Sequence, residues 1–341
     1  MRLYILIISL VIFLSGCQSY IAYQITKPPQ KVLPKQFESS IALSGVQTHY
    51  CSSEVDCLDF RFISPKDIES YLLDGNTLSL SLIVEGSTED EVFEYQLTSD
   101  NLPNNHNSGL LIIFPGYGVD SLIYTMQARW LSHVTGKNVI VMPASNQYEK
   151  FRFGLNSLDV LVNYVNKENY TDISLISYSM GAIAGVELAS KLNISKHILY
   201  APMINFEAAL NTIANLSHPI YSKLLGDDYL SEVAAKIIEK SEVPLTKLDI
   251  LNNLNKTPHA RQTYIFSSNT DKVSPYNRLL TLNNSKVSMY EVKDLNHIEM
   301  VSLISTQQRN VLLCLLDWIT STVLIIEKNI ARFLSLIRYG I

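Results

Sequence analysis

Short apolar runs alternate with longer amphipathic segments through most of the chain. The runs are rich in Ile, Leu and Val, a composition typical of strands that are buried on both faces of a sheet. Such strands are predicted at 109–114, 138–143, 172–177, 196–202, 262–268 and 286–292. Helices are predicted at about 121–134, 153–165, 181–192 and 275–282, and from about 306 onward. This alternation predicts an α/β fold in which a mostly parallel sheet carries helices on both faces.

Two segments depart from this alternation. Residues 77–86 and 91–99 are β-rich runs on either side of a turn, which predicts an N-terminal β-hairpin. Between Pro202 and Pro258 only helical patterns occur, and the interval is too long for a simple loop. We expect a helical cap at about 203–258 that lies over one end of the sheet.

The first residues have the pattern of an export signal. Arg2 precedes an apolar run from Leu3 to Leu14, which is too short for a bilayer core that needs about 20 residues. The Leu-Ser-Gly-Cys that ends at Cys17 resembles the lipobox of bacterial lipoproteins, whose cysteine is lipid-modified and becomes the new N-terminus. The resemblance implies a signal peptide at 1–16 and a membrane anchor on Cys17, outside the cytoplasm. Gln18 after the cysteine resembles the sorting pattern for the outer membrane, on its periplasmic side.

Export from the cytoplasm also affects what is expected of the segments that follow the anchor. Residues 17–40 are polar and contain three prolines, so a semi-extended tether is expected before a domain at 41–341. Cys51 and Cys57 bracket a short loop and are expected to form a disulfide in an oxidising compartment.

The end of the chain is apolar but interrupted by charge. Asp317 and Glu327 argue against a transmembrane helix there. The favoured interpretation is a core helix followed by a docked terminal helix, and the alternative is a helix on the membrane surface.

One strand-to-helix junction carries a candidate nucleophile. Ser177-x-Ser179-x-Gly181 joins the strand at 172–177 to the helix at 181–192. It resembles the nucleophile elbow of the α/β-hydrolase family, with Ser177 where glycine is commoner. The resemblance covers roughly 110–320 and implies that Ser179 is the nucleophile.

Serine at neutral pH needs a base, and in this family the chain order is serine, acid, histidine. Among the seven histidines, His297 lies beyond the last predicted strand, in the loop "KDLNHIEM". Asp271 follows the strand at 262–268 and resembles the acid of the family, whereas Asp294 is a rival in the loop of His297. We expect Asp271 to orient His297.

Backbone N–H groups are expected to bind the oxyanion. Met180, directly after the nucleophile, supplies one of them. The turn "FPGYG" resembles the family's second oxyanion segment, with Pro115 in place of a more usual histidine, and implies the N–H of Tyr117 as the other donor.

Composition narrows the function further. The net charge of −5, the pI near 5.8 and the lack of a basic stripe argue against a nucleic-acid partner. The sequence holds no metal-ligand spacing, phosphate loop or dinucleotide fingerprint, so neither a metal nor a cofactor is expected.

The family resemblance implies a serine hydrolase that cleaves a small-molecule or lipid acyl ester. The alternatives are a peptidase, an acyltransferase with the same residues, or a binding lipoprotein that has lost turnover.

Overall fold

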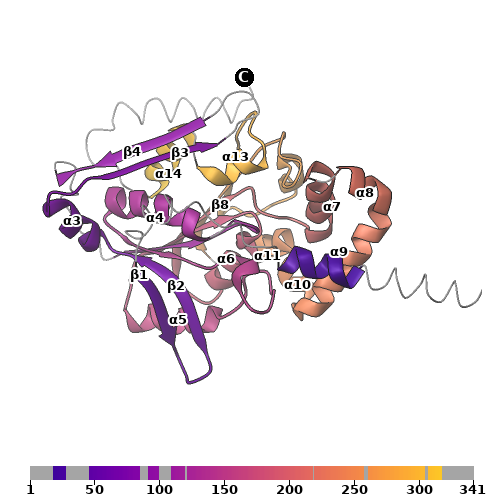
Figure 1. Cartoon of the computed structure of the whole chain (residues 1–341), viewed down its shortest axis with the longest axis horizontal. Helices are drawn as coiled ribbons and strands as arrows, with labels where there is room; N and C mark the ends of the chain where they lie inside the picture. The colour runs from indigo at the N-terminus through magenta and orange to yellow at the C-terminus, as the bar shows by residue number, and fades with distance from the viewer. Residues whose placement is uncertain are drawn as a thin grey trace, which may run out of the picture.

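A single large sheet organises the protein in the computed structural model, which describes residues 18–27, 46–84, 91–99, 109–119, 121–217, 219–256, 260–303 and 306–316. Within these residues, an eight-stranded sheet has the order β1-β2-β6-β5-β7-β8-β9-β10 (Figure 1). Its strands are β1 (Val46–Cys51), β2 (Cys57–Ile63), β5 (Leu110–Phe114), β6 (Asn138–Val141), β7 (Ile173–Tyr178), β8 (Ile194–Tyr200), β9 (Ala260–Ser267) and β10 (Val287–Glu291). The six strands from β6 to β10 in this order run parallel, and β2 pairs antiparallel with β6.

Helices cover both faces of this sheet because its strands are apolar on both faces. Leu111 and Ile113 of β5 pack with α4 (Ser121–Thr135) and α14 (Thr306–Leu315) in one buried cluster. Leu110 and Ile112 point the other way and pack with α5 (Leu158–Lys167) and α6 (Gly181–Ala189). The period of two along a strand produces this division. The predicted mostly parallel sheet with helices on both faces is therefore confirmed.

The predicted hairpin is also present. β3 (Leu78–Val84) pairs antiparallel with β4 (Glu91–Leu97) in a two-stranded sheet of its own. Leu78 and Leu97 are buried in the cluster beneath α4, so the hairpin packs against the main domain.

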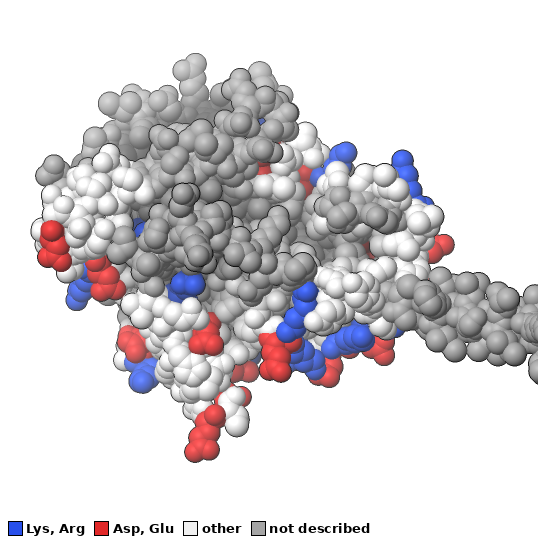
Figure 2. All heavy atoms as spheres, in the orientation of Figure 1, with Lys and Arg blue, Asp and Glu red and all other residues white. Residues whose placement is uncertain are grey.

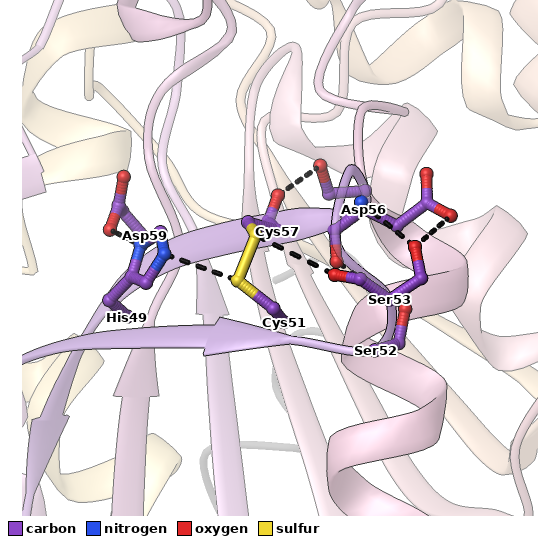
Figure 3. The surroundings of a disulfide bond; sticks show 8 residues. His49, Cys51, Ser52, Ser53, Asp56, Cys57 and Asp59 are labelled. Carbon is purple, nitrogen blue, oxygen red and sulfur yellow. Dashed lines mark hydrogen bonds and ion pairs between the residues drawn. A yellow bond between two sulfur atoms is a disulfide. The ribbon is translucent and has the colours of Figure 1, made fainter.

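A second hairpin was not predicted. β1 and β2 extend the main sheet at its edge, and the Cys51–Cys57 disulfide joins them directly across the ladder (Figure 3). The predicted disulfide is thus present: it closes the short loop between the two cysteines and joins the two strands at the edge of the sheet. His49 lies beside it, with Nδ1 2.8 Å from Asp59 Oδ1 and Nε2 3.2 Å from Cys51 Sγ.

The helical cap lies between β8 and β9, as expected. It consists of α7 (Phe206–Ser217), α8 (Pro219–Leu225), α9 (Asp227–Ser241), α10 (Leu245–Leu248) and α11 (Ile250–Lys256). Buried residues of α7, α9 and α11 form one cluster with Met180 and Ile183, which follow β7. The cap therefore packs directly over the junction that holds the candidate nucleophile.

The prediction of a semi-extended tether is wrong for its first residues. Residues 18–26 form a helix, the indigo helix beside α9 in Figure 1. Ala22 is only 2% exposed and belongs to the buried cluster of the cap. The predicted signal peptide at 1–16, Cys17, the predicted tether from 28 to 40 and the chain end beyond 316 lie outside the described residues. None of the helices in the described ranges is both long and apolar enough to cross a bilayer.

Two other helices differ from their predicted bounds. α5 begins at Leu158 rather than near 153 because Phe153 and Ser157 have positive φ angles of 55° and 56°, which a continuous helix excludes. α12 (Tyr276–Leu279) is a single turn instead of a helix over 275–282.

On the face shown in Figure 2, acidic and basic side chains lie interspersed on the described surface.

Candidate active site

The strand-to-helix junction at Ser179 is a sharp, strained turn. Ser179 has a φ of 47°, a conformation that residues other than glycine rarely adopt. Its N–H donates to the carbonyl of Tyr200 (3.0 Å), and its own carbonyl accepts from the N–H of Met203 (3.1 Å). These bonds to β8 and the segment after it hold the turn in place. They fix the Ser179 side chain just beyond the carboxyl end of β7.

Two glycines let α6 approach the sheet closely. A Cβ at Gly181 would lie 2.5 Å from the carbonyl oxygens of Phe114 and Pro115. A Cβ at Gly185 would lie 2.1 Å from Ser177 Oγ, which itself lies 2.9 Å from His197 Nε2. Any side chain at either glycine would therefore push the helix away from β5 and β7. Ser177 is a buried structural residue that bonds to the neighbouring strand.

The structure brings the three predicted residues together. His297 Nε2 lies 2.9 Å from Ser179 Oγ, and His297 Nδ1 lies 2.8 Å from Asp271 Oδ2. A carboxylate only accepts hydrogen bonds, so it holds the proton of the imidazole on Nδ1. Nε2 is then free to accept the proton of the serine hydroxyl. Residues separated by as many as 118 positions thus form one hydrogen-bonded chain.

The choice between the two candidate acids is decided by burial and bonding. Asp271 is completely buried, and its Oδ1 accepts from the N–H groups of Val273 (2.8 Å) and Ser274 (2.9 Å). Its other oxygen faces His297. Asp294, the rival in the sequence, is exposed at a positive φ of 63°. Asp271 is therefore the carboxylate that contacts the imidazole.

The loop that carries His297 is fixed by contacts that were not predicted. His297 is the first residue of α13 (His297–Ser302), and Asn296 caps this helix. Asn296 Oδ1 accepts from two N–H groups of the first turn, while Glu299 Oε2 accepts from the Asn296 N–H (2.6 Å). This capping box is readable in the sequence as a polar residue followed three positions later by glutamate. Thr270 Oγ1 also donates to the Leu295 carbonyl (2.8 Å), which ties the acid loop to the histidine loop.

The two predicted oxyanion donors line the same cavity as Ser179 and His297. Within the described part of the chain, neither the Met180 N–H nor the Tyr117 N–H donates to a protein acceptor. The turn of Tyr117 is held by the next residue, because the Gly118 N–H donates to Asn146 Oδ1 (3.1 Å). Both groups are thus available to a bound oxygen atom.

A cavity of about 590 Å³ opens from the serine, within the ~300–1,000 Å³ usual for small-molecule sites. Its lining is mainly apolar, and none of its described lining residues is charged. The lining consists of Ile21, Gln24, Ile25, Tyr117, Ser179, Met180, Met203, Phe206, Ala209, Leu210, Ile213, Ala214, Ser222, Leu225, Leu230, Val273 and His297. The first three come from the helix at 18–26, which the sequence did not associate with the site.

The one group of His, Cys or acidic side chains close enough to share a metal ion, among the residues described, lies elsewhere. It comprises His49, Cys51 and Cys57. Because the two cysteines form a disulfide, their sulfur atoms are already bonded to each other. The Ser179 site itself is built from an alcohol, an imidazole and one carboxylate.

Comparisons with known proteins found solved structures that are similar to this chain at low sequence identity. An esterase from Pyrococcus furiosus is similar at 15% identity and a TM-score of 0.47, over 73% of this chain and 90% of that one. A thermophilic esterase from Thermogutta terrifontis is similar at 12% identity and a TM-score of 0.47, over 81% of this chain and 100% of that one. The mouse alpha/beta hydrolase domain-containing protein 10 is similar at 13% identity and a TM-score of 0.48, over 80% of this chain and 97% of that one. Neither a protein-family model nor a curated protein sequence matches.

The protein has an α/β-hydrolase fold. The sheet order and the strained serine between β7 and α6 carry this conclusion. Likeness at such low identity and TM-score does not bear on the reaction, so the function has to be inferred from the geometry of this site.

Proposed function

We propose that this protein is a serine hydrolase that cleaves a carboxylic ester through an acyl-enzyme on Ser179. The observation that carries this proposal is the chain of hydrogen bonds from Ser179 through His297 to the buried Asp271. Such a chain raises the nucleophilicity of an otherwise weak serine hydroxyl.

In the first half of the reaction, Ser179 Oγ attacks the ester carbonyl and its proton passes to His297 Nε2. The carbonyl oxygen becomes an oxyanion, which accepts from the N–H groups of Met180 and Tyr117. In related chemistry one such donor contributes about 3 kcal/mol. The intermediate collapses, the carbon–oxygen bond to the alcohol breaks, and His297 gives its proton to the leaving alkoxide.

In the second half, His297 Nε2 takes a proton from water, and the resulting hydroxide attacks the acyl carbonyl. Collapse of this intermediate breaks the bond to Ser179 Oγ, which recovers the proton from His297. Asp271 stabilises the imidazolium in both halves and keeps the ring oriented. The products are a carboxylic acid and an alcohol.

An ester is favoured over a peptide by the character of the cavity. The uncharged, mainly apolar lining suits an acyl chain and offers few polar groups to bind a peptide backbone. The test is hydrolysis of a panel of p-nitrophenyl esters by the wild type and by Ser179→Ala. We expect turnover only with the wild type. Equal turnover by both would contradict the proposal, and turnover of peptides alone would favour the peptidase alternative.

We also propose that the protein is a lipoprotein anchored through Cys17, on the periplasmic side of the outer membrane. The support is the signal-like N-terminus and the lipobox-like residues before Cys17. Metabolic labelling with an alkyne fatty acid, followed by membrane fractionation, tests it. The wild type should be labelled and membrane-bound, and Cys17→Ser should be neither. Labelling of both proteins would contradict the anchor.

A further inference from the structure

The helix at 18–26 lies outside the region that resembles the hydrolase family, yet it forms part of the cavity wall. Ile21, Gln24 and Ile25 face the cavity. Their spacing of three and four residues places them on one face of the helix. Tyr20 and Tyr23 are 64% and 59% exposed and do not line the cavity. The helix therefore presents one face to the substrate site and another to solvent.

Contacts at both of its ends fix this helix over the site. At its start, Gln18 Nε2 donates to Glu232 Oε2 of α9 in the cap. At its end, the hydroxyl of Tyr117 donates to the carbonyl of Ile25. Burial raises the pKa of Tyr117 to about 12, so this hydroxyl remains a donor at neutral pH. The helix thus bridges the cap and the residue whose N–H is proposed to bind the oxyanion.

Ser179 and His297 line the cavity at the point where an ester carbonyl has to sit for attack. Most of the other lining side chains are apolar, and several come from the helix at 18–26 and from α7, which contributes Leu210 and Ile213. Further polar lining residues include Gln24 and Ser222. An acyl chain bound by its carbonyl beside Ser179 would contact the apolar side chains of the helix at 18–26 and of α7.

We propose that Ile21 and Ile25 determine acyl-chain specificity, and that the substrate is an ester of a long-chain fatty acid. This inference rests on the proposed hydrolase function and names the substrate class of the same site. Each methylene group removed from water by the two isoleucines contributes about 0.8 kcal/mol, which corresponds to about fourfold in kcat/KM. The helix that carries these residues begins at Gln18, directly after Cys17, so the cavity lining and the predicted lipid anchor lie close together in the chain.

The experiment compares kcat/KM for p-nitrophenyl esters from acetate to palmitate in the full mature chain. Ile25→Trp narrows the cavity beside the acyl chain. We expect it to lower the palmitate-to-acetate ratio by about tenfold or more, since a pocket wall discriminates by steric exclusion. Tyr23→Trp introduces the same indole side chain on the exposed face of the same helix, and its ratio should equal that of the wild type. Ile21→Ala is a second variant, which removes contact without overpacking and should lower the ratio by a few-fold.

Two results would overturn the inference. One is a ratio that stays at the wild-type value in both Ile25→Trp and Ile21→Ala while their melting temperatures are unchanged. The other is an equal loss on acetate and palmitate, which would mean that the helix supports the site without selecting the chain. Failure of the wild type to hydrolyse any ester would refute the proposed function instead, and acetate turnover without longer-chain turnover would refute the substrate class alone.

Discussion

The hydrogen-bonded triad of Ser179, His297 and Asp271 and the cavity wall are held by different kinds of interaction. Around Asp271 and His297, directional hydrogen bonds fix each polar group, and the carboxylate is completely buried. The wall formed by the helix at 18–26 and α7 rests mainly on apolar contacts, with two polar bonds at the ends of the helix. Hydrogen bonds depend steeply on geometry, whereas apolar burial scales with area. The triad should therefore respond abruptly to small chemical changes, and the wall should respond gradually.

The largest effect is expected at the acid. Asp271→Asn preserves the shape of the side chain but replaces an acceptor with an amide that can donate. The imidazole would then adopt the wrong tautomer, and kcat should fall by about 10⁴-fold. Asp294→Asn makes the same change at the exposed rival and should retain wild-type kcat. Equal losses of kcat in the two variants would contradict the assignment of Asp271 as the carboxylate that orients His297.

A packing change next to the triad should affect stability. Gly185→Ala places a methyl group 2.1 Å from the present position of Ser177 Oγ, so α6 or β7 has to shift. The expected loss in the free energy of unfolding is about 1–3 kcal/mol, measured by urea denaturation. Gly116→Ala is the control, because its added Cβ would contact Ser179 Cβ at an ordinary 3.5 Å. A stability loss as large in Gly116→Ala would contradict the packing explanation.

A smaller effect is expected from the link between the acid and histidine loops. Thr270→Val keeps the side-chain volume but removes the hydroxyl, which bonds both the Leu295 carbonyl and Ser268 Oγ. The loss of about 1 kcal/mol should lower kcat/KM about fivefold by loosening the position of His297. Thr281→Val is the matched control, since its hydroxyl bonds to the Arg278 carbonyl three residues earlier, away from the acid and histidine loops. If kcat/KM falls equally in both variants, the bond between the acid loop and the histidine loop does not position His297.

The smallest effect is expected from removing a single methylene group from the wall. Ile213→Val removes one methylene group from the cavity lining. It should lower kcat/KM for palmitate esters by about fourfold at most and leave acetate esters nearly unchanged. Ile220→Val makes the same change at a residue that is 79% exposed and outside the lining, and no change is expected. A large loss of kcat/KM on both palmitate and acetate esters in Ile213→Val would contradict the gradual response expected of the wall.

The sequence predicted the main sheet and the location of the candidate site well, because both depend on strong local patterns. The buried strands are continuous apolar runs, and their carboxyl ends meet at one edge of the sheet. Loops that follow such strands are therefore brought together whatever their separation in the chain. That is why the resemblance at the elbow of Ser179 and at the loop of Asp271, together with the family's order along the chain, could name Ser179, Asp271 and His297. The choice of Asp271 over Asp294 depends on burial, which the sequence shows only indirectly.

The missed elements depend on tertiary contacts. The helix at 18–26 contains β-branched and aromatic residues and has weak intrinsic helical preference, so its structure depends on packing against the cap. β1 is exposed or half-buried throughout and lacks the apolar run of a central strand. Its antiparallel pairing with β2 and the disulfide compensate for this weak pattern. Neither element could be identified from periodicity alone.

The most direct test of the account uses a fluorophosphonate, which forms a covalent bond only with an activated serine. Intact-mass and peptide mass spectrometry would compare the wild type with Ser179→Ala and Ser177→Ala, two serines at the same turn. The account predicts one label on Ser179 in the wild type, none in Ser179→Ala, and a label in any folded Ser177→Ala protein. Labelling of Ser179→Ala at the wild-type rate, or no labelling of the wild type, would contradict it.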